Sequence, residues 1–563
     1  MTVTIPHFSE MPVVEPDMAD LQARHDALYA RFDGATSTAD RVAVVRDWEQ
    51  LRRDVDTWGS LVSLRFYQDT TDPERKAARE RLDELSPAIT QLGNELKKRL
   101  LACDDRAGLA AQLGEHVFNL WACDTRTFDE SIKDDLVEES RLTARYVELR
   151  SSAKLEFRGE TLNLSSIGRY LSDPDRQTRY EANRVRWQFF ADHAEEFDAL
   201  YDKLVRLRTA IARKLGYPSF VELAYDRMSR TDYGRADVEG FRDEIRRVLV
   251  PLTVELKRRQ AERLGVDRLM SWDEPVQDPQ GNPKPHGDSA WMVERATAMF
   301  DAMHPELGAF FRMMNDRGLL DLDTRDGKAG GGFCTSMPSW GVPFIFANFN
   351  GTRGDATVFT HEMGHAFQFW SSREQPLHDY LWPTYEACEI HSMSLEYLTF
   401  PWMEQFFEGE AERFRFLHLV ENLQFLPYGA AVDEFQHAVY DQPELTPAER
   451  RALWTSIEAR YLPGRDYGDL PHVGDGGLWQ GQSHIYEVPF YYIDYTLAEA
   501  CALQFWVHSR EDFDAALERY VALCRRGGSL PFRQLTESAG LIPPFQRGSL
   551  EAVVEHVRRE LDL

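Results

Sequence analysis

Apolar residues recur at steps of three and four along most of the chain, which is the period of one face of an α-helix. The pattern covers residues 17–150 and is clearest over residues 40–67, where the apolar positions include Val42, Val45, Trp48, Leu51, Val55 and Trp58. It resumes over residues 173–264, and again from Thr357 almost to Leu563. The sequence therefore predicts a mainly α fold.

Two segments have the pattern of β-strands instead. Residues 155–164 alternate around a central Gly159, which predicts a hairpin. Residues 342–349 (Val-Pro-Phe-Ile-Phe-Ala-Asn-Phe) are the best strand candidate. Because Pro343 cannot donate a hydrogen bond to a neighbouring strand, we expect an edge strand or a strand with a frayed start. Asp, Pro, Gly and Asn gather over residues 271–288 and predict a surface loop.

The net charge of the chain argues against some classes of binding partner. The 563 residues include 65 Lys and Arg against 93 Asp and Glu, which gives a net charge of −28. A field of this sign repels phosphate backbones and anionic lipid surfaces. We therefore expect neither nucleic acid nor a membrane as a partner.

The cysteine pattern and the N-terminus indicate the compartment. The six cysteines are scattered and form no C-x-x-C pair, which argues against a disulfide framework and against a thiolate zinc site. The first residues lack the basic and apolar regions of a secretory signal, and no window approaches 18 uninterrupted apolar residues. These features predict a cytoplasmic protein.

The segment His361-Glu-Met-Gly-His365 carries the clearest chemistry. On a helix, positions i and i+4 share one face, so both imidazoles can bind one cation while Glu362 lies beside them, within reach of a metal-bound water. Asp355 is a candidate N-cap for this helix. The flanking residues are apolar on nearly every side, and buried imidazoles need partners. A metal is one partner, and backbone carbonyls contacted by core histidines are the alternative.

A catalytic zinc ion needs a third protein ligand. The metzincin pattern requires Gly and His at positions that hold Gln368 and Ser371 here, so that class is excluded. The next helix is predicted after Thr384, and it places carboxylates on one face: Glu386, Glu389 and Glu396. We predict Glu389 as the third ligand. Glu386 and Glu396 are candidates to orient a ligating histidine, with a helix-dipole contact or an ordinary ion pair as the alternatives.

These segments resemble the thimet oligopeptidase and oligoendopeptidase F family of zinc peptidases (family M3), most closely its Pz-peptidase-like branch. The resemblance lies in residues 361–368, in residues 385–396, and in a third block over residues 479–495. It implies that Glu389 opens the E-x-x-S-x-x-x-E pattern of the third ligand. It also implies that His484 and Tyr495, with Tyr491 or Tyr492 between them, bind the substrate carbonyl and the oxyanion. Pro489 stands where the mammalian thimet pattern has a tyrosine.

The reaction predicted is hydrolysis of internal peptide bonds by a single zinc ion per chain, held by His361, His365 and Glu389. Glu362 acts as general base on the activated water. The predicted catalytic donors are His484, Tyr492 and Tyr495, and Tyr491 is predicted to contact substrate.

A substrate in extended form could add to the edge strand 342–349, which makes Phe344, Phe346 and Ala347 candidate substrate-binding residues. The resemblance implies two helical halves around a deep central channel, with a small β-sheet beside the H-E-x-x-H helix, and oligopeptides as substrates. We expect the N-terminal half to cover residues 1–190 and the catalytic half residues 191–563.

Two other functions compete with this prediction. A zinc carboxypeptidase with the same ligands would release single residues from C-termini. A di-metal carboxylate oxidase built on a helical bundle would use two E-x-x-H pairs, Glu362 with His365 and Glu434 with His437. It leaves His361 without a role.

Overall fold

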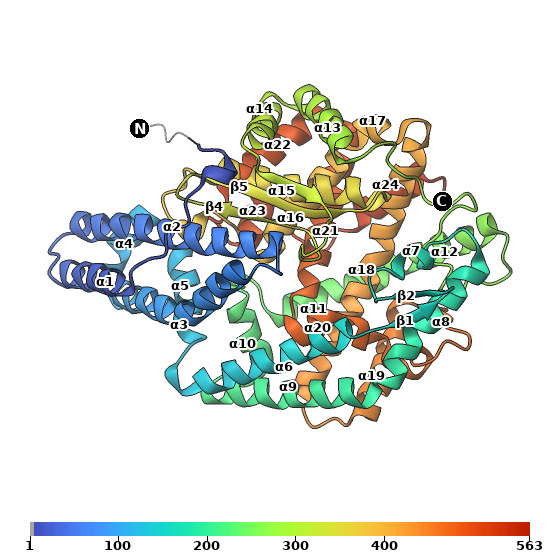
Figure 1. The fold of residues 1–563 in the computed structure, drawn as a ribbon, viewed down its shortest axis with the longest axis horizontal. Helices are drawn as coiled ribbons and strands as arrows, with labels where there is room; N and C mark the ends of the chain where they lie inside the picture. The colour runs from blue at the N-terminus through green and yellow to red at the C-terminus, as the bar shows by residue number, and fades with distance from the viewer. Residues whose placement is uncertain (1–4) are drawn as a thin grey trace.

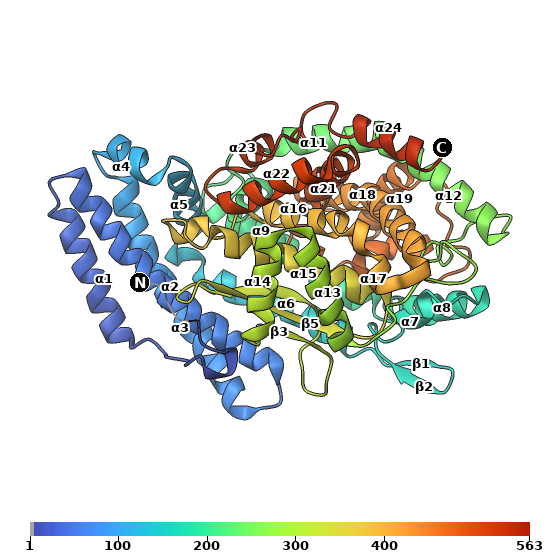
Figure 2. The same cartoon turned by 90° about the horizontal axis from the view of Figure 1, so that it is seen from above.

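The computed structural model describes residues 5–563 of the chain, and the fold is mainly helical, as the sequence predicts. Figures 1 and 2 show the first helices gathered at one end of the molecule and the C-terminus near the other. The N-terminal helices are α1 (Met18–Asp33), α2 (Thr38–Gln68), α3 (Pro73–Leu101), α4 (Arg106–Leu113), α5 (His116–Arg126) and α6 (Lys133–Ser151). Asp17, Ser37 and Asp72 cap the first three of them by accepting backbone N–H groups.

The predicted hairpin separates these helices from the middle of the chain. It consists of β1 (Leu155–Phe157) and β2 (Glu160–Leu162), which pair in antiparallel fashion. The helices that follow are α7 (Gly168–Leu171), α8 (Arg176–Asp192), α9 (Ala194–Lys214), α10 (Phe220–Arg227), α11 (Arg235–Glu244), α12 (Val250–Leu264), α13 (Ser289–Met303) and α14 (Pro305–Asp316). The predicted loop lies between α12 and α13.

A second sheet has the strand order β3-β5-β4, with β3 (Leu320–Asp323), β4 (Phe333–Met337) and β5 (Val342–Phe349). The predicted strand 342–349 is therefore the central strand: it pairs in parallel with β3 and in antiparallel with β4. The edge-strand alternative is wrong, whereas a frayed start agrees with the register, because pairing with β3 begins at Ile345, after Pro343. The missing N–H of Pro343 therefore costs no hydrogen bond to β3.

The remaining helices form the C-terminal part of the fold. They are α15 (Arg353–Ser372), α16 (Tyr385–Leu398), α17 (Glu404–Phe407), α18 (Ala411–Asp441), α19 (Pro447–Tyr461), α20 (Ser483–Glu487), α21 (Tyr492–Glu511), α22 (Phe513–Arg526), α23 (Phe532–Ser538) and α24 (Glu551–Glu560). Thr384 precedes α16 as predicted. Asp355 lies in the first turn of α15, after the N-cap position Thr352, and its carboxylate accepts the N–H groups of Asn350 and Gly351.

Helix α15 packs against β5 on one side and against α16 on another. Gly364 makes the second contact possible, since a Cβ atom at this position would lie 2.4 Å from the backbone oxygen of His391. The two backbones therefore approach more closely than any side chain would permit. This contact fixes the relative position of the two helices that carry the predicted metal ligands.

One large hydrophobic cluster runs from α6 to the C-terminus and also includes Phe8, Met11, Leu61 and Leu64. A second cluster joins mainly residues of α1–α5, and a small third one joins Trp58, Val62 and Leu85. The second cluster also includes Leu377 and Tyr380, so the N-terminal helices pack against the catalytic part of the chain. The division into halves at residue 190 stays a prediction.

Candidate metal centre and active site

His361, His365 and Glu389 come together as one group whose potential ligand atoms all lie within 4.8 Å of one another. Glu389 Oε2 is 3.2 Å from His361 Nε2 and 3.5 Å from His365 Nε2. Helix α15 supplies the two imidazoles one turn apart, and α16 supplies the carboxylate. Two nitrogen donors and one carboxylate oxygen, converging on a point, fit the ligand set of a catalytic zinc ion.

The electrostatics of this group also fit a cation. Burial alone would raise the pKa of Glu389, but the two histidines hold it well below its usual range. Burial alone would lower the pKa of His361, and the hydrogen bonds of Glu389 and Glu396 raise it well above its usual value. The buried Glu389 carboxylate thus favours positive charge at this point of the site.

Glu396 orients one of the two imidazoles. Its Oε1 lies 2.7 Å from His361 Nδ1, the ring nitrogen that points away from Glu389. Its other oxygen lies 2.9 Å from His418 Nε2. A carboxylate that holds the outer nitrogen of a ligating histidine fixes the tautomer and the orientation of the ring.

His418 was not predicted from the sequence. It lies on α18, is 3% exposed, and is surrounded by the aromatic rings of Tyr397, Phe400 and Phe414. No motif links it to the H-E-x-x-H segment, because the contact with Glu396 depends on how α18 packs. A histidine among apolar residues on a buried helix was the only available signal.

Glu386 does not orient a ligating histidine; it lies in the first turn of α16, which is the alternative position considered for it. It is buried, and burial, with the nearby carboxylate of Asp494, raises its pKa to about 8. Neither of its oxygens accepts a hydrogen bond from another group in residues 5–563. Asp494 forms an ion pair with Arg230 at 2.6 Å, and the charge of Arg230 acts on Glu386 as well. Glu386 therefore belongs to a buried carboxyl pair and makes no hydrogen bond to a ligand histidine.

Glu362 lies on the same helix as the two histidines and is 6% exposed. Burial raises the pKa of its carboxyl group, while the neighbouring His361 and His365 lower it. Its Oε2 accepts no hydrogen bond from any group in the part of the chain that the structure describes. A carboxylate with a raised pKa and a free lone pair suits the uptake and release of a proton.

The third block places His484 beside three tyrosines. The ring centroid of His484 is 5.8 Å from Tyr491, 5.0 Å from Tyr492 and 5.8 Å from Tyr495. The Tyr491 hydroxyl donates to Glu389 Oε1 at 2.9 Å, which ties this block to the metal group. Burial lowers the pKa of His484 to about 4, so the imidazole is neutral at pH 7.

A cavity of about 690 Å³ contains the metal group. Glu362, Tyr491 and Tyr495 line it together with the metal group, and β4 borders it through residues 333–336. His484 and Tyr492, both predicted catalytic donors, are not among its lining residues. Tyr492 packs against Phe425 and Tyr428. Helices α2 and α5 complete the opposite wall.

Three predicted substrate-binding residues are absent from this cavity. Phe344, Phe346 and Ala347 are at most 1% exposed, and their strand β5 is paired on both sides. The prediction that a peptide adds to this strand is therefore wrong. Within residues 5–563 the strand of the sheet that has an unpaired edge beside the cavity is β4.

The second E-x-x-H pair does not join the metal group. Glu434 Oε2 accepts a hydrogen bond from the Tyr461 hydroxyl at 2.5 Å, and His437 lies 2.9 Å from Arg242 Nη1. Glu434 is half-buried and His437 is buried, and these contacts hold both residues in structural networks outside the metal group. The di-metal alternative consequently lacks its second pair of ligands.

Comparisons with known proteins identify the family of the chain. The model of the peptidase M3 N-terminal domain matches residues 8–128, and that of peptidase family M3 matches residues 169–286 and 294–555. A search of curated proteins found no match.

Within residues 5–563, no helix combines the length and the apolar character needed to cross a lipid bilayer.

Solved structures resemble the whole chain. A Pz peptidase A bound to an inhibitor is 44% identical, with a TM-score of 0.93 and 99% of each chain covered. A protein provisionally named oligoendopeptidase F is 46% identical, with the same TM-score and coverage. Another of that provisional name, from Bacillus anthracis strain Ames, is 41% identical with a TM-score of 0.88, covering 99% of this chain and 98% of its own. The chain is therefore a metalloendopeptidase of peptidase family M3, and within that family it belongs to the Pz-peptidase-like branch.

Proposed function

We propose that the protein is a zinc-dependent oligoendopeptidase that hydrolyses internal bonds of short, unfolded peptides. The observation that carries the proposal is the convergence of His361, His365 and Glu389 within one cavity, beside the Glu362 carboxylate, whose Oε2 has no partner among residues 5–563. The three ligands would hold one zinc ion. When bound, zinc supplies a Lewis acid that lowers the pKa of water and polarises a carbonyl group.

The residues of the chain supply the proton transfer. Glu362 would accept a proton from the attacking water and donate it to the leaving amine. Its burial supports this role, because a raised pKa brings the acid and base forms closer in free energy at neutral pH. Glu396 would keep the His361 ring in its ligating orientation throughout.

Donors to the developing oxyanion come from the third block. The Gln482 side-chain amide lies 2.7 Å from His484 Nδ1. If that amide donates, the proton of the neutral imidazole is at Nε2 and is available to the substrate. Tyr495 is the tyrosine of this block that we propose as a second donor, since it lines the cavity. Tyr491 would hold Glu389 through its hydrogen bond to Oε1.

A peptide in extended form would bind along β4. The backbone of this strand has an unpaired edge at the cavity wall, among the residues that the structure describes, and main-chain hydrogen bonds position a peptide without regard to most of its side chains. This binding mode predicts broad tolerance of sequence around the cleaved bond.

One experiment tests the proposal directly. Metal quantification should give one zinc per chain, and mass spectrometry of a digested peptide library should find internal cleavage. Release of single C-terminal residues alone would favour the carboxypeptidase alternative, which has the same ligands. A protein without stoichiometric zinc that still cleaves the library after treatment with a chelator would refute the metal-dependent mechanism.

A further inference from the structure

A sharp turn at Phe490 places the tyrosines of the third block. Phe490 lies between α20 and α21 and has a φ of 71°, a left-handed backbone conformation that residues other than glycine seldom adopt. A residue in this conformation is strained, and it persists only where its surroundings enforce it. Tyr491 follows directly, and Tyr495 lies in the first turn of α21; both line the active-site cavity. The turn at Phe490 therefore decides where their side chains lie.

Side chains from two distant parts of the chain hold both backbone groups of Phe490. Its N–H donates to Oε1 of Gln436, which lies on α18, at 2.9 Å. Its carbonyl accepts from Arg230 Nη2 at 2.6 Å. The same nitrogen donates to Oδ1 of Asp494, in the first turn of α21, also at 2.6 Å. Arg230 thus joins the turn to the helix that carries Tyr495.

Arg230 belongs to a segment that borders the active site. It follows Met228 and Ser229, which line the active-site cavity. Its own N–H donates to the carbonyl of Tyr225 in α10, and its guanidinium lies 4.5 Å from the centroid of the Tyr225 ring. A planar guanidinium that is stacked on a ring and attached to a short backbone turn has little freedom to move. It can therefore act as a rigid support for the turn that it contacts.

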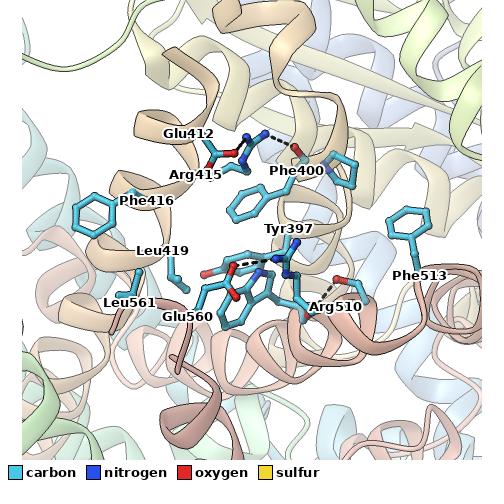
Figure 3. A pocket seen from close by; sticks show the side chains of 13 residues that line it. Tyr397, Phe400, Glu412, Arg415, Phe416, Leu419, Arg510, Phe513, Glu560 and Leu561 are labelled. Atoms are coloured by element: carbon cyan, nitrogen blue, oxygen red, sulfur yellow. Dashed lines mark hydrogen bonds and ion pairs between the residues drawn. The ribbon is translucent and has the colours of Figure 1, made fainter. Parts of the chain in front are cut away.

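The burial of this ion pair argues against stability as its main role. Figure 3 shows a surface example at a cavity of about 450 Å³, where the exposed side chains of Arg510 and Glu560 form a pair. The side chains of Arg230 and Asp494 are both 0% exposed, and Nε and Nη1 of Arg230 have no acceptor within residues 5–563. The desolvation of two charges can exceed their mutual attraction, so a buried pair is a weak source of stability. Orientation of the groups that it contacts is the role that remains.

A second buried arginine holds the other side of the turn. The side chain of Arg208, on α9, is 0% exposed, and its Nη2 donates to the carbonyl of Tyr486 in α20 at 2.6 Å. Its Nε pairs with Glu139 at 2.6 Å. Helix α20 also carries His484. Arginines thus hold main-chain carbonyls on both sides of the turn, and Arg230 is the one on the side of the tyrosines.

We propose that Arg230 is a positioning residue for peptide hydrolysis and acts through Tyr491 and Tyr495. The inference rests on the proposed function, in which Tyr491 holds Glu389 and Tyr495 donates to the oxyanion. By fixing the turn before these residues, Arg230 sets the places of both hydroxyl groups. An error of about 1 Å in the place of a catalytic group can cost about 100-fold in rate.

The substitution Arg230→Met tests this role, because it removes both hydrogen bonds and keeps an unbranched side chain. In steady-state assays with an internally quenched peptide, kcat should fall about 100-fold, while KM should change less than about threefold. Arg230→Lys, which keeps a charged donor, should recover at least about a tenfold part of this loss. A folded Arg230→Met variant with the parental kcat would refute the proposal.

Arg179→Met is the matched control. Arg179 is also buried, donates to the carbonyl of Trp272 at 3.0 Å and pairs with the buried Asp273 at 2.8 Å, but it does not line the active-site cavity. Its replacement should lower the midpoint of thermal unfolding and leave kcat within about threefold of the parental value. A loss of kcat as large as that of Arg230→Met would show that any buried arginine has this effect, and would refute a specific role of Arg230.

The dependence of the loss on the tyrosines separates positioning from a general structural role. In a background that carries Tyr491→Phe and Tyr495→Phe, Arg230→Met should lower kcat by less than about threefold, because the hydroxyl groups that it places are already absent. A loss of about 100-fold in both backgrounds would refute the proposal. If circular dichroism shows that Arg230→Met does not fold, Arg230→Met combined with Asp494→Leu takes its place, since it leaves no unpaired buried charge. The same dependence on the tyrosines is expected of it.

Failure of this inference can be distinguished from failure of the proposed function. Replacement of Tyr491 by 3-fluorotyrosine reports the surroundings of its ring by ¹⁹F NMR, with neither metal nor substrate present. The ¹⁹F resonance should shift in Arg230→Met and stay in place in Arg179→Met. A resonance that does not move in Arg230→Met refutes the role of Arg230, whatever the activity. A parent enzyme that cleaves no peptide contradicts the proposed function instead, and the ¹⁹F measurement still decides whether Arg230 positions Tyr491.

Discussion

Replacement of Glu396 by Gln should weaken zinc binding although no metal ligand is changed. Each oxygen of Glu396 faces a histidine nitrogen: His361 Nδ1 at 2.7 Å and His418 Nε2 at 2.9 Å. When His361 binds the metal through Nε2, its Nδ1 carries the proton and must donate. A carboxylate accepts from both histidines, whereas an amide offers one acceptor and one donor. The Glu396→Gln substitution would consequently place an NH2 group against one N–H donor.

The cost follows from the hydrogen bond that is lost. A hydrogen bond to a charged group contributes about 1.5–3 kcal/mol, and about 1.4 kcal/mol corresponds to a factor of ten in affinity. We therefore expect Glu396→Gln to raise the Kd for zinc by about 10- to 100-fold, the range found for outer partners of ligating histidines. The double variant Glu396→Gln with His418→Ala should bind zinc more tightly than Glu396→Gln alone, because it removes one of the two competing donors.

Competition with a chromophoric chelator measures this Kd, and circular dichroism of the zinc-free variants verifies that each is folded. Glu386→Gln is the matched control, since Glu386 is buried on the same helix but makes no hydrogen bond to a metal ligand. The Kd of Glu386→Gln for zinc should stay within about threefold of the parental value, a change below about 1 kcal/mol. A folded Glu396→Gln variant with the parental Kd would refute the role assigned to Glu396.

Three other predictions concern separate parts of the molecule. Glu362→Gln should keep one zinc per chain by metal analysis but lose nearly all turnover; retention of most activity would rule out Glu362 as the base. Tyr495→Phe should lower kcat more than it raises KM in steady-state assays, and the reverse pattern would make Tyr495 a binding residue. Burial lowers the pKa of His472 to about 4. Between about pH 6.5 and pH 4 the unfolded chain therefore binds a proton that the folded chain does not, and the free energy of unfolding falls as pH falls. Denaturant titrations of the zinc-free protein should show that the free energy of unfolding falls less with pH in His472→Asn than in the parent. Asn tolerates the positive φ of 70° at this position. The same pH dependence in both proteins would contradict the assignment to His472.

The sequence predicts the parts of this molecule that depend on local spacing. Residues 40–67 were expected to be helical and lie within α2. The i, i+4 spacing of His361 and His365 determines which face of α15 they share, and Thr384 marks the start of α16. The contact of Glu389 with both histidines was predicted from position and family resemblance, and the distances agree with it.

Features that depend on packing between distant segments were missed or wrong. Pro343 indicated an edge strand, but the register of β3 decides whether a missing N–H matters, and no local pattern encodes that register. His418 is significant only because α18 brings it to Glu396, and the position of α18 is set by the tertiary fold. The sequence places Glu386 on the same helical face as Glu389. In the structure Glu386 lies near Asp494 of α21 instead of the ligating histidines.

The contact at Gly364 has a consequence for how the metal site tolerates change. The helices that supply the ligands meet backbone to backbone, with the Ser392 Cα only 2.6 Å from the position of a Cβ on residue 364. The distances between the metal ligands on α15 and α16 are therefore set by the main chain and not by the sizes of surrounding side chains. Substitutions in the neighbouring core can therefore accumulate without changing the distances between the metal ligands. A redesign of the site for a larger cation would have to begin by altering this contact between the two helices.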